Sequence, residues 1–244
     1  MSEHAPDTKT LIILPAYNEQ GKIGRVVEKV QATNIPCTIL VVDDCSTDNT
    51  RAEAESLGAT VITHEQNTGV GGGIRTGIQY GLDNNFEIGV VMSGDDQHEP
   101  SELPRALAPI QNNTADFVQG SRYMEGGQLI NERLFRKVTT HGYSWVFSVL
   151  TGTKITDATN GFRAFRFSVF ADPSINLNQE WLNTYELEPY LLYKAVQSKN
   201  IRVVEAPITI RYHATGKEYT KMRPVRDWWR LARPMFILKL RLKK

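Results

Sequence analysis

Residues 90–100 read VVMSGDDQHEP, and the interpretation of the whole chain starts from this stretch. A run of apolar residues ends abruptly in Ser93 and Gly94, which are followed by two adjacent carboxylates, Asp95 and Asp96. Adjacent like charges repel each other, so a fold gains no stability from placing them together. We therefore expect a cation, or another group that a carboxylate can hold, beside this stretch.

The stretch closes one of several apolar runs that alternate with helical patterns in the first half of the chain. Short apolar runs predict buried strands, and apolar residues at helical spacing, such as Ile23, Val27 and Val30, predict helices between them. This alternation predicts an α/β fold with a mostly parallel central sheet and helices on both faces. The predicted strands cover residues 11–17, 37–44, 59–65, 87–94 and 115–122.

The second half of the chain is less regular. It predicts one helix over residues 131–150 and another over residues 184–197. Residues 201–213 predict two strands that a proline separates. The first of these helices has apolar positions at Leu134, Val138, Trp145 and Val149. We interpret residues 1–222 as one domain and residues 223–244 as a tail.

Charge is unevenly distributed between the domain and the tail. The net charge is +1, so the composition does not point to nucleic acid, but residues 221–244 hold nine Lys or Arg against one acid. Cations mixed with large apolar residues suit a helix that lies on an anionic membrane surface. The apolar residues are Trp228, Trp229, Met235, Phe236, Ile237 and Leu238. Pro224 and Pro234 predict short helical pieces, and the alternative is that the tryptophans cover the core.

The cysteines and the N-terminus indicate a cytoplasmic protein. Cys37 and Cys45 lack the spacing and the histidine partners of a metal site. The first ten residues are polar, so no secretion signal is expected. No apolar run approaches the roughly 18–20 residues that cross a bilayer. Because no secretion signal is expected, we expect the thiols of Cys37 and Cys45 to be reduced.

Polar residues gather at the predicted carboxyl ends of three strands, where open parallel sheets bind ligands. The ends at residues 15–19, 43–44 and 93–95 should converge on one crevice. Carboxylate and amide oxygens are hard ligands that suit Mg²⁺ or Mn²⁺. Asp95 and Gln97 alternate along an extended segment, so both can face one ion. The alternative is a solvated acidic loop.

Two nucleotide-binding motifs fail in the Gly-rich segment that follows the third predicted strand. The dinucleotide fingerprint has Ile74 at its sixth position, and the phosphate-loop spacing has Ile78 where lysine is required. We interpret the glycines as a tight turn that enters a helix close to the crevice. His64 and His141 stand alone and are interpreted as surface or packing residues.

Six motifs occur in order with compatible spacing: PAYNE, VVDDCSTD, NTGVGGGIRTG, SGDDQHEP, QGSRY and TDATNGFRAF. Over about residues 9–222 they resemble family 2 glycosyltransferases, and most nearly the dolichol-phosphate mannosyltransferase-like branch, the polyprenyl-phosphate glycosyltransferases. The resemblance implies an A-type glycosyltransferase fold and a nucleotide sugar (UDP-, GDP- or dTDP-linked) as donor. It also implies Mg²⁺ or Mn²⁺ as cofactor and inversion at the anomeric carbon.

The resemblance also implies roles for the residues at the strand ends. The nucleoside would be held by Pro15, Tyr17 and Glu19, with Asp43 or Asp44 on the base or ribose. The metal would be bound by Asp95 with Gln97 beside it, next to Ser93 and Gly94 as substrate-binding residues.

On the acceptor side, the resemblance implies that Arg122 faces the donor diphosphate or the acceptor phosphate. Asp157 and the turn at residues 160–163 would line the acceptor. His213 and Lys221, in a mobile loop that closes over the donor, would contact phosphate.

The acceptor decides whether a base is needed. A lipid phosphate is already ionised, whereas the hydroxyl of a saccharide or lipid-linked glycan requires a base, for which Asp157 is the candidate. The alternative for Asp157 is a cap or a loop hydrogen bond. A lipid acceptor also requires a membrane, so we expect a protein bound through its tail to the cytoplasmic face, with a homodimer or a membrane partner as a further expectation.

One residue departs from the pattern. The family usually has an acid where this chain has Ser93. Two alternatives to a fully active enzyme follow: an enzyme that binds its metal more weakly, or a non-catalytic protein that binds nucleotide sugars. We prefer an active enzyme, because the other motifs are intact.

Overall fold

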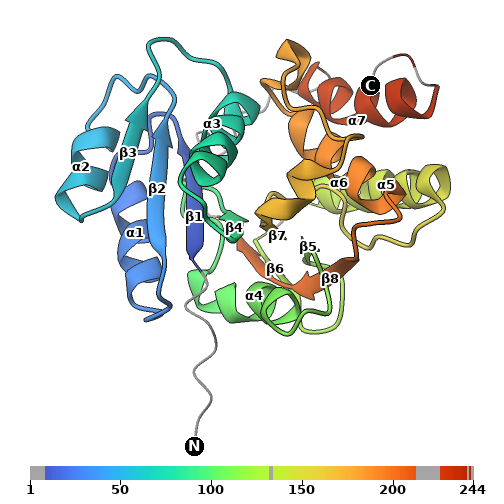
Figure 1. The fold of residues 1–244 in the computed structure, drawn as a ribbon, viewed down its shortest axis with the longest axis horizontal. Helices are drawn as coiled ribbons and strands as arrows, with labels where there is room; N and C mark the ends of the chain where they lie inside the picture. The colour runs from blue at the N-terminus through green and yellow to red at the C-terminus, as the bar shows by residue number, and fades with distance from the viewer. Residues whose placement is uncertain (1–8, 132–133, 213–225, 241, 243–244) are drawn as a thin grey trace, which may run out of the picture.

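The computed structural model describes residues 9–131, 134–212, 226–240 and 242, and Figure 1 shows their arrangement. Seven strands form one sheet in the order β3-β2-β1-β4-β7-β5-β8. Their bounds are β1 Thr10–Ala16, β2 Thr38–Asp43, β3 Thr60–Thr63, β4 Ile88–Val91, β5 Phe117–Ser121, β7 Arg163–Arg166 and β8 Val203–Pro207. The strands β6 (Gln128–Ile130) and β9 (Thr209–Arg211) form a separate parallel pair.

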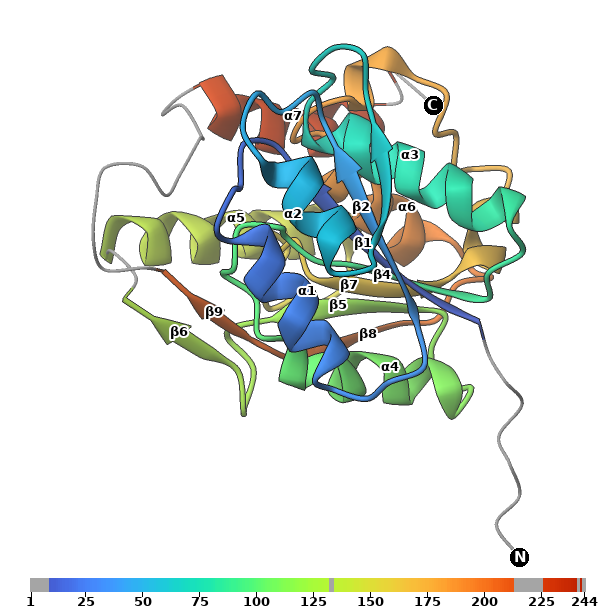
Figure 2. The same cartoon turned by 90° about the vertical axis from the view of Figure 1, so that its left-hand side faces the viewer.

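Helices cover both faces of the sheet (Figures 1 and 2). One face packs against α1 (Ile23–Gln31), α2 (Thr50–Ser56) and α4 (Leu103–Gln111). The other packs against α3 (Val70–Asp83), α5 (Leu134–Thr151), α6 (Leu187–Gln197) and α7 (Arg226–Lys239). Short 3₁₀ turns cover Pro100–Glu102, Phe167–Ala171 and Glu180–Leu182.

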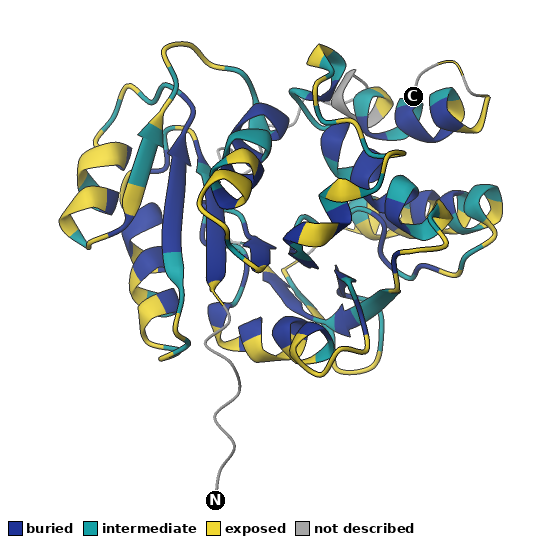
Figure 3. Ribbon diagram, viewed as in Figure 1, coloured by how far each residue is buried: buried dark blue, intermediate teal, exposed yellow. Residues whose placement is uncertain are grey.

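The central strand β1 shows why these layers form. Leu11 and Ile13 face the core under α3, whereas Ile12 and Leu14 face the core under α1 and α4. Alternate residues of a strand point to opposite faces, so a continuously apolar strand fits only where both faces are covered. Figure 3 shows these central strands as buried, together with the inner faces of the helices that cover them. The α/β fold predicted from the sequence is confirmed.

The largest difference from the sequence prediction is β7, which lies antiparallel between β4 and β5. The sequence indicated only a turn at residues 160–163, because two arginines interrupt the apolar pattern of this short strand. Its antiparallel direction brings its first residue, Arg163, beside Val91 at the end of β4 and beside Gln119 of β5. Residues 157–163 therefore reach the end of the sheet at which the polar strand ends lie.

The helix α5 corrects a second prediction. The apolar residues that the sequence indicated, Leu134, Val138, Trp145 and Val149, are 76%, 63%, 69% and 62% exposed. Tyr143 and Phe147 face the core instead. Helical periodicity identifies a face but does not say which way that face points.

The tail also differs from its prediction. Residues 226–239 form one helix through Pro234, rather than short pieces, and Leu231, Met235 and Leu238 of this helix are buried in the core that α5 and α6 share. Burial of these residues offsets the hydrogen bond that an internal proline removes. Met235 and Leu238 are thus not available to a membrane, whereas Trp229 and Phe236 are exposed.

The side chain of Trp228 and the whole of Pro224 lie outside the described residues. Among the helices that are described, none has the length and apolar character needed to cross a bilayer.

Candidate active site

The carboxyl ends of β1, β2 and β4 meet, as the sequence predicts. The N–H of Asp44 donates to the carbonyl of Ala16 (2.9 Å), and the N–H of Met92 donates to that of Ile13 (3.1 Å). Gly94 lies so close to the carbonyl of Pro15 that an added Cβ would come within 3.0 Å of it. A side chain at this position would force the two strand ends slightly apart, so glycine suits their close approach.

The first strand end is held against α2. Glu19 is buried, with its N–H donating to Thr50 Oγ1 (2.7 Å) and its carboxylate paired with Lys22 (2.8 Å). Tyr17 is 37% exposed, which leaves its ring accessible to a ligand. Pro15 of the same strand end packs against Gly73 of the Gly-rich segment.

The second strand end organises the Gly-rich segment. The buried carboxylate of Asp44 accepts hydrogen bonds from the N–H groups of Thr68 (2.8 Å) and Gly69 (2.7 Å), and it contacts His64 Nδ1 (2.7 Å). His64 also contacts Thr76 Oγ1 (2.8 Å), so the interpretation of His64 as an isolated residue is wrong. Asp43 is buried as well and accepts from the N–H of Ser46 (3.1 Å). The predicted contacts of Asp43 and Asp44 with a base or ribose stay predictions.

The glycines at the start of α3 have a structural reason. The N–H of Gly72 donates to the carbonyl of Asn183 (2.9 Å). A Cβ on Gly71 would come within 2.0 Å of the carbonyl oxygen of Leu182. The backbone of residues 182–184 therefore lies directly on this turn, and only glycine permits that approach.

The adjacent carboxylates that opened the sequence analysis point to different partners. Asp96 is buried and pairs with Arg25 (2.9 Å) and Lys29 (2.7 Å) of α1. Burial alone would raise its pKa, but the hydrogen bonds from these cations outweigh burial and lower the pKa of Asp96. Asp95 forms no ion pair with any described residue. Repulsion between the two acids is thus relieved by α1, which leaves the charge of Asp95 for the crevice.

The surroundings of Asp95 fit a divalent cation. Burial raises its pKa, and the nearby charge of Glu19 acts in the same direction, whereas the hydrogen bond to Ser93 opposes the rise. A cation bound there would relieve both effects. Asp95 Oδ1 accepts from the N–H of Gln97 (3.2 Å), which keeps the two predicted ligands together. Across the described residues, no cluster of three acidic, histidine or cysteine ligands exists. An ion held by Asp95 and Gln97 would complete its shell with substrate phosphates and water, as Mg²⁺ commonly does.

The two residues predicted to be catalytic, Arg122 and Asp157, form a buried ion pair with each other. The guanidinium donates from Nε to Asp157 Oδ2 (2.5 Å) and from Nη2 to Oδ1 (2.7 Å), and Nη1 donates to the hydroxyl of Tyr212 (3.1 Å). Asp157 Oδ1 accepts further hydrogen bonds from Thr159. Burial would lower the pKa of Arg122, but Asp157 outweighs burial and raises it. Both oxygens of Asp157 are occupied and the residue has no exposed surface. This geometry favours a structural role over proton transfer.

A wider polar network surrounds this pair, and motif reasoning did not find it. Gln119 is completely buried, donates to the carbonyls of Asp157 and Asn160 (both 3.0 Å), and accepts from Arg163 Nε (2.9 Å). Arg163 also pairs with Glu188 of α6 (2.6 Å). The only sequence signal was the placement of polar residues inside otherwise apolar runs. Most buried groups of this network satisfy one another, whereas the side-chain nitrogen of Asn160 is buried without a hydrogen-bond partner among the described residues.

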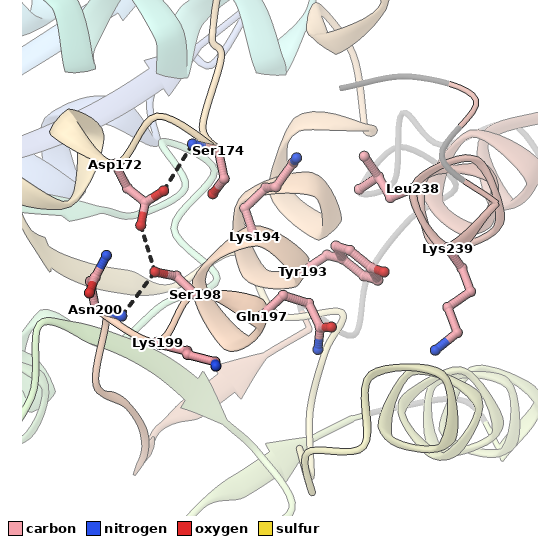
Figure 4. A pocket seen from close by; sticks show the side chains of 10 residues that line it. All are labelled: Asp172, Ser174, Tyr193, Lys194, Gln197, Ser198, Lys199, Asn200, Leu238 and Lys239. Atoms are coloured by element: carbon pink, nitrogen blue, oxygen red, sulfur yellow. Dashed lines mark hydrogen bonds between the residues drawn. The ribbon is translucent and has the colours of Figure 1, made fainter.

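Two predicted site residues, His213 and Lys221, lie outside the described residues. A hollow is present elsewhere, between the end of α6, residues 172–174 and the end of α7 (Figure 4). Its lysines, Lys194, Lys199 and Lys239, point in different directions, so the cations do not converge on one anion. The strand ends, rather than this hollow, form the candidate site.

Comparison with known proteins identifies the family of this chain. The family model described as glycosyl transferase family 2 matches residues 11–172. An undecaprenyl-phosphate mannosyltransferase of Micrococcus luteus is 30% identical over 86% of this chain and 86% of its own. A UDP-N-acetylglucosamine–dolichyl-phosphate N-acetylglucosaminyltransferase of Methanococcus voltae is 33% identical over 84% of this chain and 87% of its own. A polyprenol monophosphomannose synthase of Mycolicibacterium smegmatis is 33% identical over 86% of this chain and 80% of its own.

Solved structures show the same fold. Glucosyl-3-phosphoglycerate synthase from Mycobacterium tuberculosis, in complex with Mg²⁺ and UDP, aligns with a TM-score of 0.68 at 15% identity, covering 97% of this chain and 80% of that one. Mannosyl-3-phosphoglycerate synthase from Rubrobacter xylanophilus aligns with a TM-score of 0.67 at 18% identity, covering 96% and 74%. At this level of identity the likeness concerns the fold alone, which is the A-type glycosyltransferase fold that the sequence predicts.

Proposed function

This chain belongs to glycosyl transferase family 2 and is a glycosyltransferase, and from that premise we propose that it moves a sugar from a nucleotide-sugar donor to a polyprenyl phosphate. Three relatives that share 30–33% identity over most of its length are named for transfer to undecaprenyl phosphate, dolichyl phosphate or a polyprenol. The chain retains the six motifs of that branch in order.

The burial and hydrogen bonds of Asp157 are the observation on which we base the choice between a saccharide hydroxyl and a lipid phosphate as acceptor. A saccharide hydroxyl needs a base within hydrogen-bond reach, and the residue predicted for that task is buried and fully engaged by Arg122 and Thr159. A phosphate monoester is already ionised near neutral pH and can attack the anomeric carbon without a base. The geometry therefore supports the lipid phosphate over the hydroxyl of a glycan.

Departure of the nucleoside diphosphate requires charge stabilisation, which a divalent metal supplies when it is bound. In this chain Asp95 and Gln97 would hold Mg²⁺ or Mn²⁺, and Ser93 would stand beside the ion. Tyr17, Glu19 and the end of β2 would position the nucleoside. Attack from the face opposite the leaving diphosphate inverts the anomeric centre.

The exposed apolar stripe of α5 supports contact with a membrane, where a polyprenyl phosphate resides. We define this stripe as Leu134, Val138, Trp145 and Val149, which lie on one face of the helix, opposite the buried residues. The helices α5 and α7 lie side by side, with the hydroxyl of Tyr143 donating to the carbonyl of Leu231 (2.9 Å). Large exposed apolar patches are uncommon on monomers and suit a lipid surface when cations flank them.

The cations are also present. Arg136 and Lys137 belong to α5, and residues 221–244 hold nine Lys or Arg. Trp229 and Phe236 add exposed apolar surface on α7. We therefore propose peripheral binding to the cytoplasmic face of a membrane through α5 and the tail together, rather than through the tail alone.

The test is a panel of UDP-, GDP- and dTDP-sugars with Mn²⁺ or Mg²⁺ and a short polyprenyl phosphate, followed by release of nucleoside diphosphate and analysis of the lipid product. We expect release that depends on the lipid phosphate and is lost in Asp95→Asn. A saccharide acceptor serves as the comparison. Transfer to the saccharide alone would contradict the proposed acceptor. Donor binding without release for any acceptor would indicate a non-catalytic binding protein.

A further inference from the structure

His98 is a buried residue to which neither the motifs nor the comparisons give a role. It follows Gln97 and is 6% exposed. Its Nδ1 accepts a hydrogen bond from the N–H of Ser93 (2.9 Å), so the proton of the neutral ring is on Nε2. That Nε2 faces Asn160 Oδ1 at 3.3 Å and donates to it. The imidazole therefore joins the loop after β4 to the segment before β7.

The two contacts of the ring enclose the residues proposed to hold the metal. Ser93 and His98 are the ends of a short loop, and the hydrogen bond between them closes it around Asp95 and Gln97. Asp95 in turn accepts from the N–H of Gln97 (3.2 Å). Without His98, the N–H of Ser93 would lose the acceptor that holds this end of the loop.

The other attachments of the loop hold its two flanks and its middle but do not bond the N–H of Ser93: Met92 is bonded to Ile13 of β1 before the loop (3.1 Å). Asp96 ties its middle to Arg25 and Lys29 of α1, and the carbonyl of Gln97 accepts from the N–H of Arg211 in β9 (2.9 Å). Asn160 is itself fixed, because its Oδ1 also accepts from the N–H of Phe162 (2.9 Å). The ring of Phe162 packs edge-on against the imidazole, with centroids 5.4 Å apart. The histidine is thus held rigidly while it holds the loop.

The contact with Ser93 itself requires a neutral ring, because a protonated imidazole has no acceptor to offer the N–H of Ser93. A lysine or arginine at this position would offer no acceptor to Ser93.

We propose that His98 is a positioning residue for the metal site, which it serves by holding the N–H of Ser93 so that Asp95 and Gln97 stay in a ligating arrangement. The proposal rests on the proposed function, in which those two residues hold Mg²⁺ or Mn²⁺. Residues that orient metal ligands without touching the metal commonly change metal affinity by about 10- to 100-fold when they are replaced.

Two substitutions separate this role from simple packing. In His98→Asn an amide oxygen occupies the place of Nδ1 and can accept from Ser93, whereas in His98→Gln the amide reaches toward Asn160 and the acceptor beside Ser93 is lost. We expect His98→Asn to bind Mn²⁺ within about threefold of the parent, and His98→Gln to bind it roughly tenfold more weakly or worse. His141→Asn, on the outer surface of α5, is the matched control and should leave the Mn²⁺ affinity unchanged.

The readout is Mn²⁺ binding by electron paramagnetic resonance with the full chain, without donor or acceptor. Amide hydrogen exchange of residues 92–99 accompanies it, and exchange should accelerate in His98→Gln but not in His98→Asn. Equal Mn²⁺ affinity in both variants, with both folded, would overturn the proposal. If either variant does not fold, the ring tautomer of the parent from nitrogen chemical shifts takes its place, and a proton on Nδ1 would overturn the proposal.

Asp95→Asn distinguishes failure of the proposal from failure of the proposed function. If that variant loses Mn²⁺ while His98→Gln keeps it, the metal site stands and His98 does not position it. If Asp95→Asn binds Mn²⁺ as the parent does, the metal ligands of the proposed function are wrong, and the role of His98 falls with them.

Discussion

The two halves of the sheet use charged residues in opposite ways. In the parallel half, β3-β2-β1-β4, Asp95 stands at a strand end without an ion-pair partner among the described residues. In the half that contains β7, Arg122 and Asp157 are buried and satisfy each other. Both kinds of residue lie in motifs of the same family. The difference teaches that a motif can preserve a reactive group or the buried scaffold that supports it, and only the surroundings of each charge tell which.

The largest expected effect tests the scaffold half. Asp157→Ala leaves the guanidinium of Arg122 buried without its partner, which should lower the free energy of unfolding by about 3–5 kcal/mol. Urea unfolding of the parent and the variant measures this change. A loss below about 1 kcal/mol would mean that Asp157 is not structural, and its role as a base would then regain support.

The next effect concerns His98, at the seam between the halves. Its pKa is about 4 in the folded chain against an ordinary value of 6.5. The unfolded chain takes up this proton below about pH 6.5 and the folded chain does not, so the contribution of His98 to the free energy of unfolding should fall by roughly 3 kcal/mol as the pH drops from 6.5 to 4. Urea unfolding across this window should show a shallower slope for His98→Asn. Identical slopes in both proteins would contradict the buried neutral ring.

A third effect tests the parallel half. Asp95→Asn should reduce sugar transfer by about 100-fold, because a metal ligand is lost. The variant should be at least as stable as the parent. Burial raises the pKa of Asp95, so its charged form costs stability at pH values above the ordinary pKa. The melting temperature should be equal to or above that of the parent. A variant that loses activity and stability together would place Asp95 with the scaffold residues and erase the contrast between the halves.

A fourth effect concerns the outer face of α5. Replacing Trp145 and Val149 with serine should weaken binding to anionic vesicles by at least about tenfold, since a fully buried apolar side chain contributes about 1.5–3 kcal/mol and tenfold corresponds to about 1.4 kcal/mol. Leu82→Ser, on the exposed side of α3, is the control. Sedimentation with vesicles measures binding, and size-exclusion chromatography without them tests a homodimer. Unchanged vesicle binding together with loss of a dimer would assign the stripe to a second copy of the chain.

The smallest effect is the matched control for the buried ion pair. Arg51 and Glu55 form an exposed pair on α2 (2.7 Å). Arg51→Ala should change the free energy of unfolding by less than about 0.5 kcal/mol, because solvent screens such pairs. A loss comparable to that of Asp157→Ala would show that burial is not what separates the two pairs.

The sequence by itself determined the fold class, the parallel half of the sheet and the place of the candidate site. Continuous apolar runs at β1, β2 and β4 require burial on both faces, and polar residues that follow such runs must emerge at the same end of a parallel sheet. Asp95, Gln97 and the residues after β1 could therefore be predicted as one crevice. Pattern alone was sufficient because the period of a strand and its direction leave few alternatives.

Only the tertiary structure decided which partner each group meets. Asp95 and Asp96 are adjacent and chemically identical, yet α1 neutralises one and leaves the other to the crevice. The apolar face of α5 could be recognised from its spacing, but whether it faced the core or the solvent depended on where α6 and α7 pack. Arg122 and Asp157 are separated by 35 residues, and the contact between them depends on β7 running antiparallel beside β5. Local pattern sets what a segment can form, whereas burial and pairing arise from contacts distant in sequence.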